Sequence, residues 1–244
     1  MLKKIFSRDK TLIMGILNVT PDSFYDGGKN FSLDKAAARA GEIEKEGADI
    51  LDIGGESSRP GSDEVSQEEE VRRVIPVLHA LKGHLHIPVS LDTSRSRVLE
   101  KALKTGMVSI VNDIYACRRD PRVAELAAEH GLALVLMHMQ GNPKTMQENP
   151  RYSDVISEIM TFFEERISFV TTKGVRESRI ILDPGIGFGK RLEDNLLIIK
   201  NIPKFKSFGC PVLLGPSRKS FIGMLTGRSK EERLSGTSAS VACC

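Results

Sequence analysis

Short apolar segments alternate with amphipathic helical segments along the whole chain, and this alternation constrains the fold more than any other feature. The apolar segments predict seven strands, at Thr11–Leu17, Ile50–Ile53, Pro88–Leu91, Ser109–Val111, Ala133–Met137, Ile180–Leu182 and Val212–Leu214. When helices alternate with strands in this way, the strands pair in parallel and the helices cover the sheet. The sequence therefore predicts an α/β fold, either a doubly wound sheet or a (β/α)₈ barrel.

The first strand–helix connection favours the barrel. It lacks the Gly-x-Gly-x-x-Gly pattern of a dinucleotide-binding sheet. No linker or low-complexity tract divides residues 1–244, so we expect a single domain. The printed sequence ends at Cys244, before an eighth strand is seen, and we expect a barrel that lacks its eighth strand and final helix in this chain.

Helix boundaries are indicated by capping patterns. Ser66 and Glu69 form a capping box before one helical segment, and Ser229 and Glu232 form another before the last one. Asp120 followed by Pro121 predicts a third helix start, with Asp as the cap and Pro in the first turn.

Composition excludes several classes of function. A net charge of +3 in 244 residues is small, which argues against a general nucleic-acid binder but permits a local phosphate site. No apolar stretch is long enough for a membrane span, and the N-terminal residues lack the apolar core of a signal peptide. Four cysteines without Cys-x-x-Cys spacing predict reduced thiols in a cytoplasmic protein.

Polar residues follow every predicted strand, at Asn18, Gly54–Arg59, Asp92, Asn112, His138, Asp183 and Ser217–Ser220. In a barrel the carboxyl ends of all strands open into one mouth. Carboxylates and amides match a flat heterocycle with N–H donors and carbonyl acceptors, whereas Arg and Lys match phosphate. Any one of these residues could instead cap a loop or form a solvated charge, but together they predict a phosphorylated, nucleobase-like substrate.

Six motifs resemble those of the dihydropteroate synthase family and span nearly the whole chain in the family's order. They are Gly15–Phe24, Asp52–Gly61, Asp92–Thr93, Asn112–Asp113, Asp183–Lys190 and Ser217–Ser220. The resemblance implies a (β/α)₈ barrel that joins 4-aminobenzoate to dihydropterin-methyl diphosphate in folate biosynthesis and releases diphosphate. It also implies a transferase that is a sulfonamide target, and a homodimer.

The resemblance also implies site residues. The expected pterin-binding set is Asp92, Asn112, Asp183 and Lys219, with Met137 and Phe188 as apolar walls. Asp92, Asp183 and Lys219 are the expected catalytic residues, and Asn18 is expected near the diphosphate and its Mg²⁺. The remaining substrate contacts are expected from Gly215 and from an aminobenzoate pocket formed by Phe24, Ser58, Arg59, Pro60, Lys219 and Ser220.

The implied chemistry agrees with these residue types. Departure of diphosphate leaves a cation at the pterin methylene, so Mg²⁺ and cationic side chains would stabilise the leaving group. An anionic Asp183 against the pterin would favour the cationic intermediate. The amine of aminobenzoate is already a nucleophile, so no activated Ser, Cys or His is needed.

Two departures from the family pattern affect the expected activity. Ser58 stands where Thr is common, which is a mild change. The family's eighth strand carries an Arg and a His that hold the diphosphate, and no such strand precedes Cys244. We therefore expect this exact chain to be poorly active unless it is extended by one strand–helix unit.

Two other functions compete with the synthase. A pterin-binding methyltransferase barrel would share the pterin-facing carboxylates but would not need the Thr20–Phe24 loop or Ser217–Ser220. A catalytically dead barrel that binds pterin as a partner subunit of a functional synthase is the other alternative. Pterin binding without turnover would identify this second case.

Overall fold

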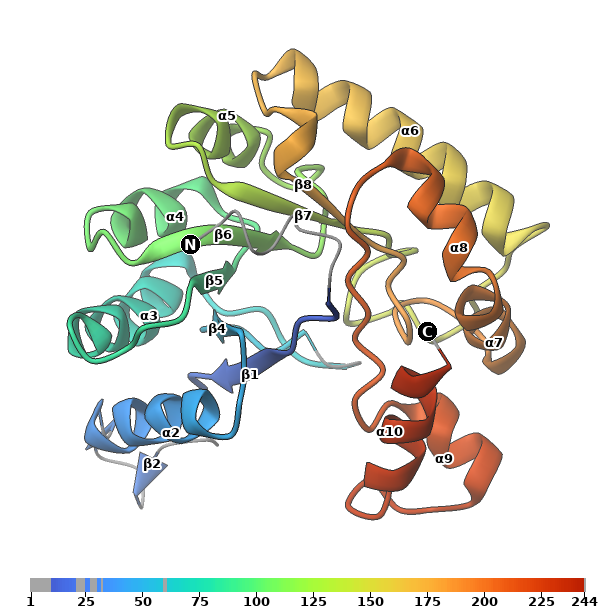
Figure 1. Ribbon diagram of the computed structural model, residues 1–244, viewed down its shortest axis with the longest axis horizontal. Coiled ribbons are helices and arrows are strands. Elements are labelled where there is room, and N and C mark those ends of the chain that lie inside the picture. Colours follow the sequence, from blue (N-terminus) through green and yellow to red (C-terminus); the bar gives the residue numbers. More distant parts are fainter. Residues whose placement is uncertain (1–9, 21–24, 27–29, 32, 59–60, 244) are drawn as a thin grey trace.

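Six parallel strands form the central sheet of the protein (Figure 1). The computed structural model describes residues 10–20, 25–26, 30–31, 33–58 and 61–243. Within these residues the strands pair in the order in which they occur along the chain. They are β1 (Met14–Asn18), β4 (Ile50–Gly54), β5 (Val89–Asp92), β6 (Val108–Asp113), β7 (Ala133–Met137) and β8 (Ile180–Asp183).

Helices cover the outside of the curved sheet and alternate with its strands, so the predicted parallel α/β arrangement is confirmed (Figure 1). The fold is that of a TIM-type barrel that does not close within the described residues. The helices are α2 (Leu33–Lys45), α3 (Gln67–Leu81), α4 (Ser96–Leu103), α5 (Arg122–Glu129), α6 (Val155–Thr172), α7 (Leu192–Lys200), α8 (Ile202–Phe205), α9 (Ser220–Thr226) and α10 (Leu234–Ala242). Two short 3₁₀ helices, η2 (Glu177–Arg179) and η3 (Lys206–Phe208), join the later elements.

The seventh predicted strand is shorter than expected. Val212 forms an isolated parallel bridge with Leu182 of β8, and the segment Val212–Leu214 does not form a continuous strand. Pro211 and Pro216 flank this segment, and a proline cannot donate a hydrogen bond to a sheet. A short antiparallel pair, β2 (Tyr25–Asp26) and β3 (Asn30–Phe31), lies where the sequence predicted only a loop.

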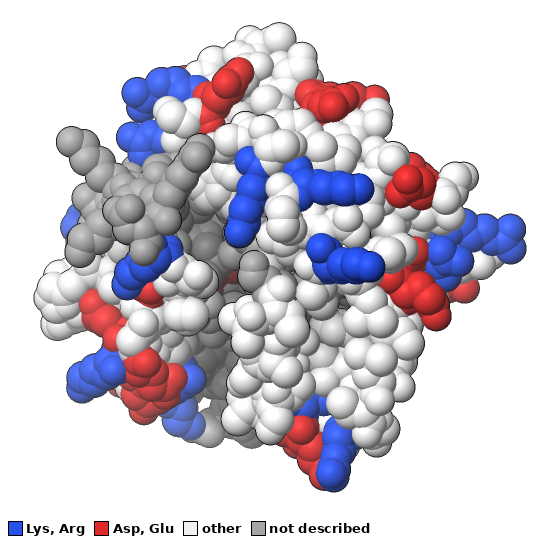
Figure 2. Space-filling view, turned by 45° about the vertical axis from the view of Figure 1, so that its right-hand side comes forward, with Lys and Arg blue, Asp and Glu red and all other residues white. Residues whose placement is uncertain are grey.

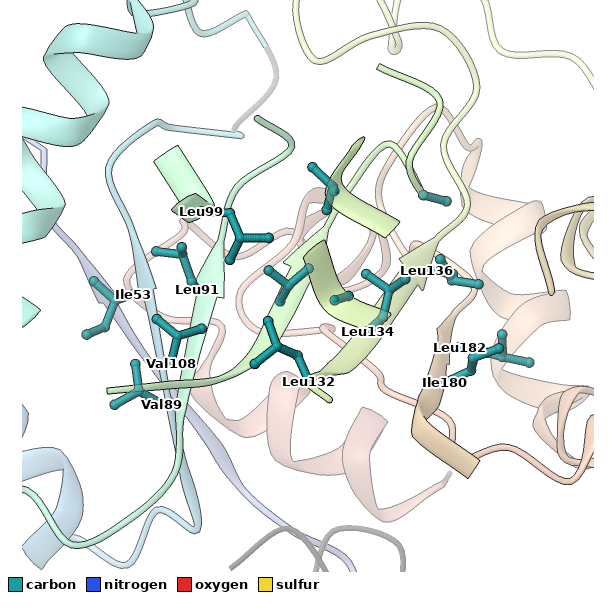
Figure 3. Close-up of a cluster of buried hydrophobic side chains, with 14 of the residues drawn as sticks. Ile53, Val89, Leu91, Leu99, Val108, Leu132, Leu134, Leu136, Ile180 and Leu182 are labelled. Atoms are coloured by element: carbon teal, nitrogen blue, oxygen red, sulfur yellow. The ribbon is translucent and has the colours of Figure 1, made fainter. Parts of the chain in front are cut away.

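The two faces of the sheet belong to different apolar clusters, because successive side chains of a strand point to opposite sides. Ile53, Leu91, Leu134 and Leu182 lie in the large cluster between the sheet and the helices, shown in part in Figure 3. The other face encloses a smaller cluster of Ile50, Ile110, Ala133, Val135 and Ile181. The large cluster fixes the helices on the sheet, and polar residues sit above the small one.

Two of the three predicted helix starts agree with the structure. Ser66 caps α3, because its Oγ accepts a hydrogen bond from the Glu69 N–H at 3.1 Å. Asp120 accepts from the N–H of Arg122, the first residue of α5. The start predicted at Ser229 is wrong, because α10 begins at Leu234. The Ser229 N–H instead donates to Glu232 Oε2 at 3.1 Å and closes a separate turn.

Charged side chains of both signs are interspersed on the face shown in Figure 2. This mixture agrees with the small net charge of +3. Cys117, Cys210 and Cys243 carry free thiols. Among the helices of the described part of the chain, none is long and apolar enough to cross a membrane.

Candidate active site

A row of inward-facing residues crosses four neighbouring strands at their carboxyl ends. Strand register places Asn18 beside Gly54, Gly54 beside Asp92, and Asp92 beside Asn112. Gly54 has no side chain, so Asp92 can occupy the space over β4. The carboxylate of Asp92 and the carboxamide of Asn112, both expected in the pterin-binding set, thus lie side by side at the carboxyl ends of β5 and β6.

Asp52 lies one layer deeper, under this row. Its Oδ2 accepts a hydrogen bond from Asn112 Nδ2 at 3.2 Å. Its Oδ1 and the Oγ of Ser90 are buried and have no hydrogen-bond partner within the part of the chain that the structure describes. Burial raises the pKa of Asp52 to about 6, although the hydrogen bond from Asn112 opposes this shift. Burial and the charge of Asp52 raise the pKa of Asp92 well above its usual value.

We expect Asp52→Asn to stabilise the fold above pH 6. The native pKa of about 6 exceeds the usual 3.8, so the native state holds a proton that the unfolded chain has lost. Wild-type stability therefore falls between these pH values and stays reduced above them, by roughly 3 kcal/mol for a shift of about two pKa units. An asparagine escapes this loss and can donate to Ser90 Oγ.

Urea unfolding at pH 8 and pH 4 measures this effect. The gain should be present at pH 8 and should largely vanish at pH 4. Asp63→Asn, which changes a carboxylate whose side chain is 85% exposed, is the control and should alter stability little at either pH. A loss of stability in Asp52→Asn at pH 8 would contradict the account.

Asp183 ends β8 beside Met137 of β7. Its Oδ1 accepts a hydrogen bond from the Gly185 N–H at 2.7 Å, which fixes the carboxylate at the start of the following loop. Burial raises the pKa of Asp183, whereas the Gly185 N–H and the charges of Lys219 and Lys190 oppose the rise. One carboxylate oxygen is therefore committed to the loop, and the other is left for a ligand.

The glycine-rich loop after β8 folds tightly against β7. Gly185 has φ +69°, and a Cβ at this position would overlap the carbonyl oxygen of His138. The buried amine of Lys190 donates to the carbonyl oxygens of His138 at 3.2 Å and Phe188 at 2.9 Å. It also lies 3.1 Å from His138 Nδ1. These contacts join the ends of β7 and β8.

Burial affects both partners in this join. It lowers the pKa of Lys190 to about 7, because the charged amine has little water around it. Burial and the charge of Lys190 lower the pKa of His138 to about 2. His138 is therefore neutral in the folded protein, and its contact with Lys190 contributes to the structure of the loop.

Lys219 and Phe188 lie together near Asp183 and the loop that follows β8. The Lys219 amine lies 4.0 Å from the centre of the Phe188 ring and donates a hydrogen bond to the Ile186 carbonyl. Burial lowers the pKa of Lys219 to about 8, and the nearby charge of Asp183 opposes this shift. Phe188 in turn packs on a methionine cluster formed by Met137, Met139 and Met146. Apolar and cationic side chains thus lie side by side near Asp183.

The loop after β4 borders a cavity beside Asp92. Ser58, Ile114 and Tyr115 are among the residues that line it. Gly215 is partly buried after the Val212 bridge, and Ser220 is exposed at the start of α9. Phe24, Arg59 and Pro60, which were predicted in the aminobenzoate pocket, lie outside the described residues.

Sequence reasoning did not select Asp52 or the join between Lys190 and His138 as parts of the site. A signal for Asp52 was present, since it is the only charged residue in the apolar segment Ile50–Ile53. It lies two residues after Ile50, so its side chain points to the same inner face of the sheet. His138 was noted at a strand end and Lys190 in the motif Asp183–Lys190, but no signal indicated their contact, because it depends on how two loops meet.

The fold and site together define a barrel enzyme with its ligand site at the carboxyl ends of the strands. A family model described as pterin binding enzyme matches residues 14–244. The chain belongs to this family, within its dihydropteroate synthase branch. The dihydropteroate synthase of Bacillus subtilis is 47% identical over 96% of this chain and 79% of its own length. That of Escherichia coli K12 is 46% identical over 98% of this chain and 86% of its own length.

Solved structures give the same result. Xanthomonas albilineans dihydropteroate synthase with 4-aminobenzoic acid superposes with a TM-score of 0.89 and 42% identity, over 96% of this chain and 84% of the other. The Yersinia pestis enzyme in a sulfonamide drug complex superposes with a TM-score of 0.88 and 41% identity, over 95% of this chain and 84% of the other.

Proposed function

We propose that the chain is a dihydropteroate synthase, a transferase of folate biosynthesis. It condenses 4-aminobenzoate with (7,8-dihydropterin-6-yl)methyl diphosphate to give 7,8-dihydropteroate and diphosphate. The observation that carries this function is the pairing of Asp92 with Asn112, whose register sets a carboxylate beside a carboxamide at the carboxyl ends of β5 and β6. Such a pair matches the edge of a flat ring with N–H donors and carbonyl acceptors.

The residues divide the work of the reaction as follows. Asp92, Asn112 and Asp183 bind and orient the pterin, and Met137 and Phe188 hold its faces. As the bond between the methylene carbon and the diphosphate oxygen breaks, positive charge grows on the pterin. The carboxylate of Asp183 stabilises that charge. The aminobenzoate nitrogen then forms the new bond to the methylene carbon and loses a proton.

We propose that Lys219 contacts both the pterin and the aminobenzoate. Ser58, Arg59, Pro60, Phe24, Gly215 and Ser220 complete the substrate contacts in this proposal. The cavity lined by Ser58 beside Asp92 supports an aminobenzoate site at the loop after β4. A sulfonamide with the shape of aminobenzoate would compete for this place.

We propose Mg²⁺ as the cofactor, held by the carboxamide oxygen of Asn18. Among the described residues no cluster of three His, Cys, Asp or Glu side chains could hold a metal. Mg²⁺ does not need such a cluster, because it can take one or two protein ligands and fill its shell with phosphate oxygens and water. Asn18 is only partly buried at the end of β1, so its oxygen can reach a ligand. When bound, the ion would neutralise charge on the diphosphate.

We further propose that the chain acts as one domain over residues 1–244, in the cytoplasm, and as a homodimer. Free thiols at Cys117, Cys210 and Cys243 suit a reducing compartment. Exposed apolar side chains on α9 and α10 support self-association, with Met224 67% exposed and Leu234 60% exposed.

A coupled measurement tests the function. Calorimetry with the pterin diphosphate is followed by an assay for dihydropteroate and diphosphate on addition of 4-aminobenzoate, with this chain and with a version extended by one strand–helix unit. The proposal expects stoichiometric release of both products in at least the extended version. Pterin binding without turnover in both would identify a non-catalytic binding barrel and overturn the proposal.

A further inference from the structure

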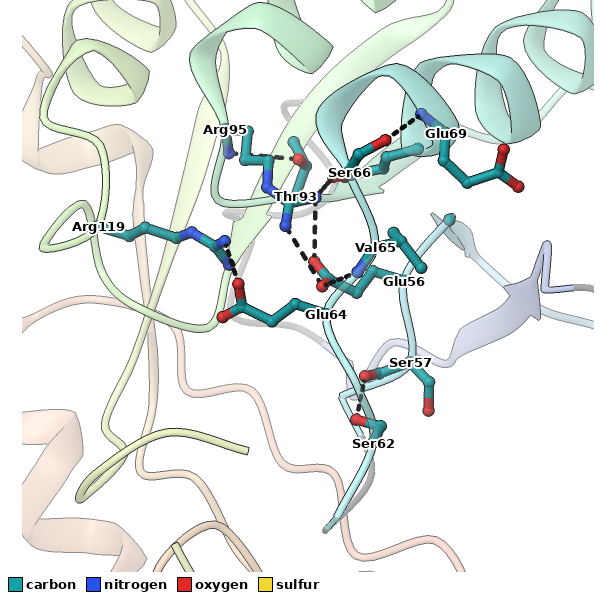
Figure 4. Close-up of polar contacts among 12 residues, drawn as sticks. Glu56, Ser57, Ser62, Glu64, Val65, Ser66, Glu69, Thr93, Arg95 and Arg119 are labelled. Carbon is teal, nitrogen blue, oxygen red and sulfur yellow. Dashed lines mark hydrogen bonds and ion pairs between the residues drawn. The ribbon is translucent and has the colours of Figure 1, made fainter. Parts of the chain in front are cut away.

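A buried charged network lies beneath the loop that follows β4. Arg95 precedes α4, and Glu56 is part of the loop (Figure 4). Glu70 belongs to α3. Arg95 Nη1 donates to Glu70 Oε2 at 2.6 Å and lies 3.3 Å from Glu56 Oε2. The exposed fractions of the Arg95, Glu70 and Glu56 side chains are 6%, 1% and 21%, so the guanidinium is enclosed by its two carboxylates.

Glu56, which is held by Arg95, in turn binds the far end of the loop. The Val65 N–H donates to Glu56 Oε1 at 3.1 Å, which ties the two ends of residues 56–65 together. Arg73 of α3 adds a second hold at the start of the loop, since its Nη1 donates to the Gly55 carbonyl at 2.9 Å. The segment between these ends includes Ser58, which lines the cavity beside Asp92.

The outer side of the same loop is held by ion pairs near the surface. Glu64 pairs with Arg119, and Asp63 pairs with Lys144, each at 2.9 Å. The Glu64 and Asp63 side chains are 62% and 85% exposed, and such pairs are screened by water and contribute little. A buried pair is screened far less, and removal of one partner leaves an uncompensated charge. The position of the loop therefore depends on the buried side.

We propose that Arg95, acting through Glu56, is the positioning residue that holds the loop after β4 for the amine substrate. Arg95 follows Asp92, the last residue of β5, by three positions. The Arg95 side chain therefore fixes the loop relative to the strand end that carries Asp92. The inference rests on the proposed function, which places aminobenzoate at this loop. Loss of the contact to Glu56 should affect the aminobenzoate KM and leave pterin binding in place.

Glu56→Gln and Glu70→Gln form a matched pair for the test. Each variant removes one of the two carboxylate charges that contact Arg95 and keeps the size of the glutamate side chain, but only Glu56 belongs to the loop. We expect Glu56→Gln to raise the KM for 4-aminobenzoate at least fivefold, with kcat and the pterin diphosphate Kd within twofold of wild type. Glu70→Gln should lower the Tm and leave all three constants within twofold. Arg97→Met, which removes an ion pair with Glu68 between two exposed side chains outside the lining of this cavity, should change neither the Tm nor the three constants.

Hydrogen exchange of the ligand-free protein supplies a readout that does not need turnover. Amides of residues 61–66 should exchange faster in Glu56→Gln than in Glu70→Gln or wild type. An equal rise in KM for both Gln variants, or no rise in Glu56→Gln, would overturn the positioning role. Failure of both the wild-type chain and its extended version to form product would count against the proposed function, while the exchange result would still decide whether Glu56 fixes the loop.

Discussion

Replacement of Asp183 by asparagine is expected to weaken pterin binding by about 10-fold to about 150-fold, because a charged hydrogen bond worth roughly 1.5–3 kcal/mol is lost. The variant should keep the fold, since an amide oxygen can still accept the hydrogen bond from the Gly185 N–H. The carboxylate oxygen that faces the ligand becomes an amide, which cannot stabilise a growing positive charge. Product formation should therefore fall more than pterin affinity.

Calorimetry with a pterin ligand, together with circular dichroism, measures these outcomes. Asp113→Asn is the matched control. Asp113 is also a buried carboxylate at a strand end, but its oxygens accept from the N–H groups of Tyr115 and Cys117 and close a turn. Its replacement should alter stability and leave pterin affinity within twofold. An unchanged affinity in Asp183→Asn would remove Asp183 from the pterin site.

Gly185→Ala is expected to reduce the free energy of unfolding by roughly 2–5 kcal/mol, through a left-handed backbone and steric overlap acting together. Its φ of +69° disfavours any residue with a Cβ, and that Cβ would collide with the His138 carbonyl. Because Lys190 joins the same carbonyl to the loop, displacement of Gly185 should also disturb Phe188. Pterin affinity should fall with stability.

Gly209→Ala separates the two causes. Gly209 has φ +74° but open space around the position that a Cβ would occupy. Gly209→Ala should lower the free energy of unfolding by about 1 kcal/mol, through the left-handed backbone alone. Guanidinium unfolding of both variants gives the comparison, and equal destabilisation would show that the contact with His138 contributes nothing.

The repeated pattern of apolar strand and amphipathic helix was sufficient to predict the layers of this fold. Ala133–Met137 was placed at its exact bounds, because an apolar run buried on both faces leaves little ambiguity. Val212–Leu214 is also entirely apolar but forms only one bridge, because strand pairing depends on the neighbour and on flanking prolines. Local composition cannot report either the neighbour's position or the register.

The site was predictable where the position of a residue along its strand is enough to place its side chain. Asp92 and Asn112 were expected to meet because both follow parallel strands, and the register places them side by side. The Arg95 network was not predicted, because Glu56, Glu70 and Arg95 come from a loop, a helix and a second loop. Such contacts arise from packing between elements, which no periodicity in one segment encodes.

The hydrogen bond from Lys219 to the Ile186 carbonyl has a consequence for selectivity. An ammonium has three donors, so this carbonyl takes one of them and leaves two for an incoming molecule. The carbonyl also fixes the direction of the amine before any ligand arrives. A compound whose acceptors match the two remaining donors therefore binds with little rearrangement of Lys219, whereas a compound with its acceptors elsewhere must first break the bond to Ile186.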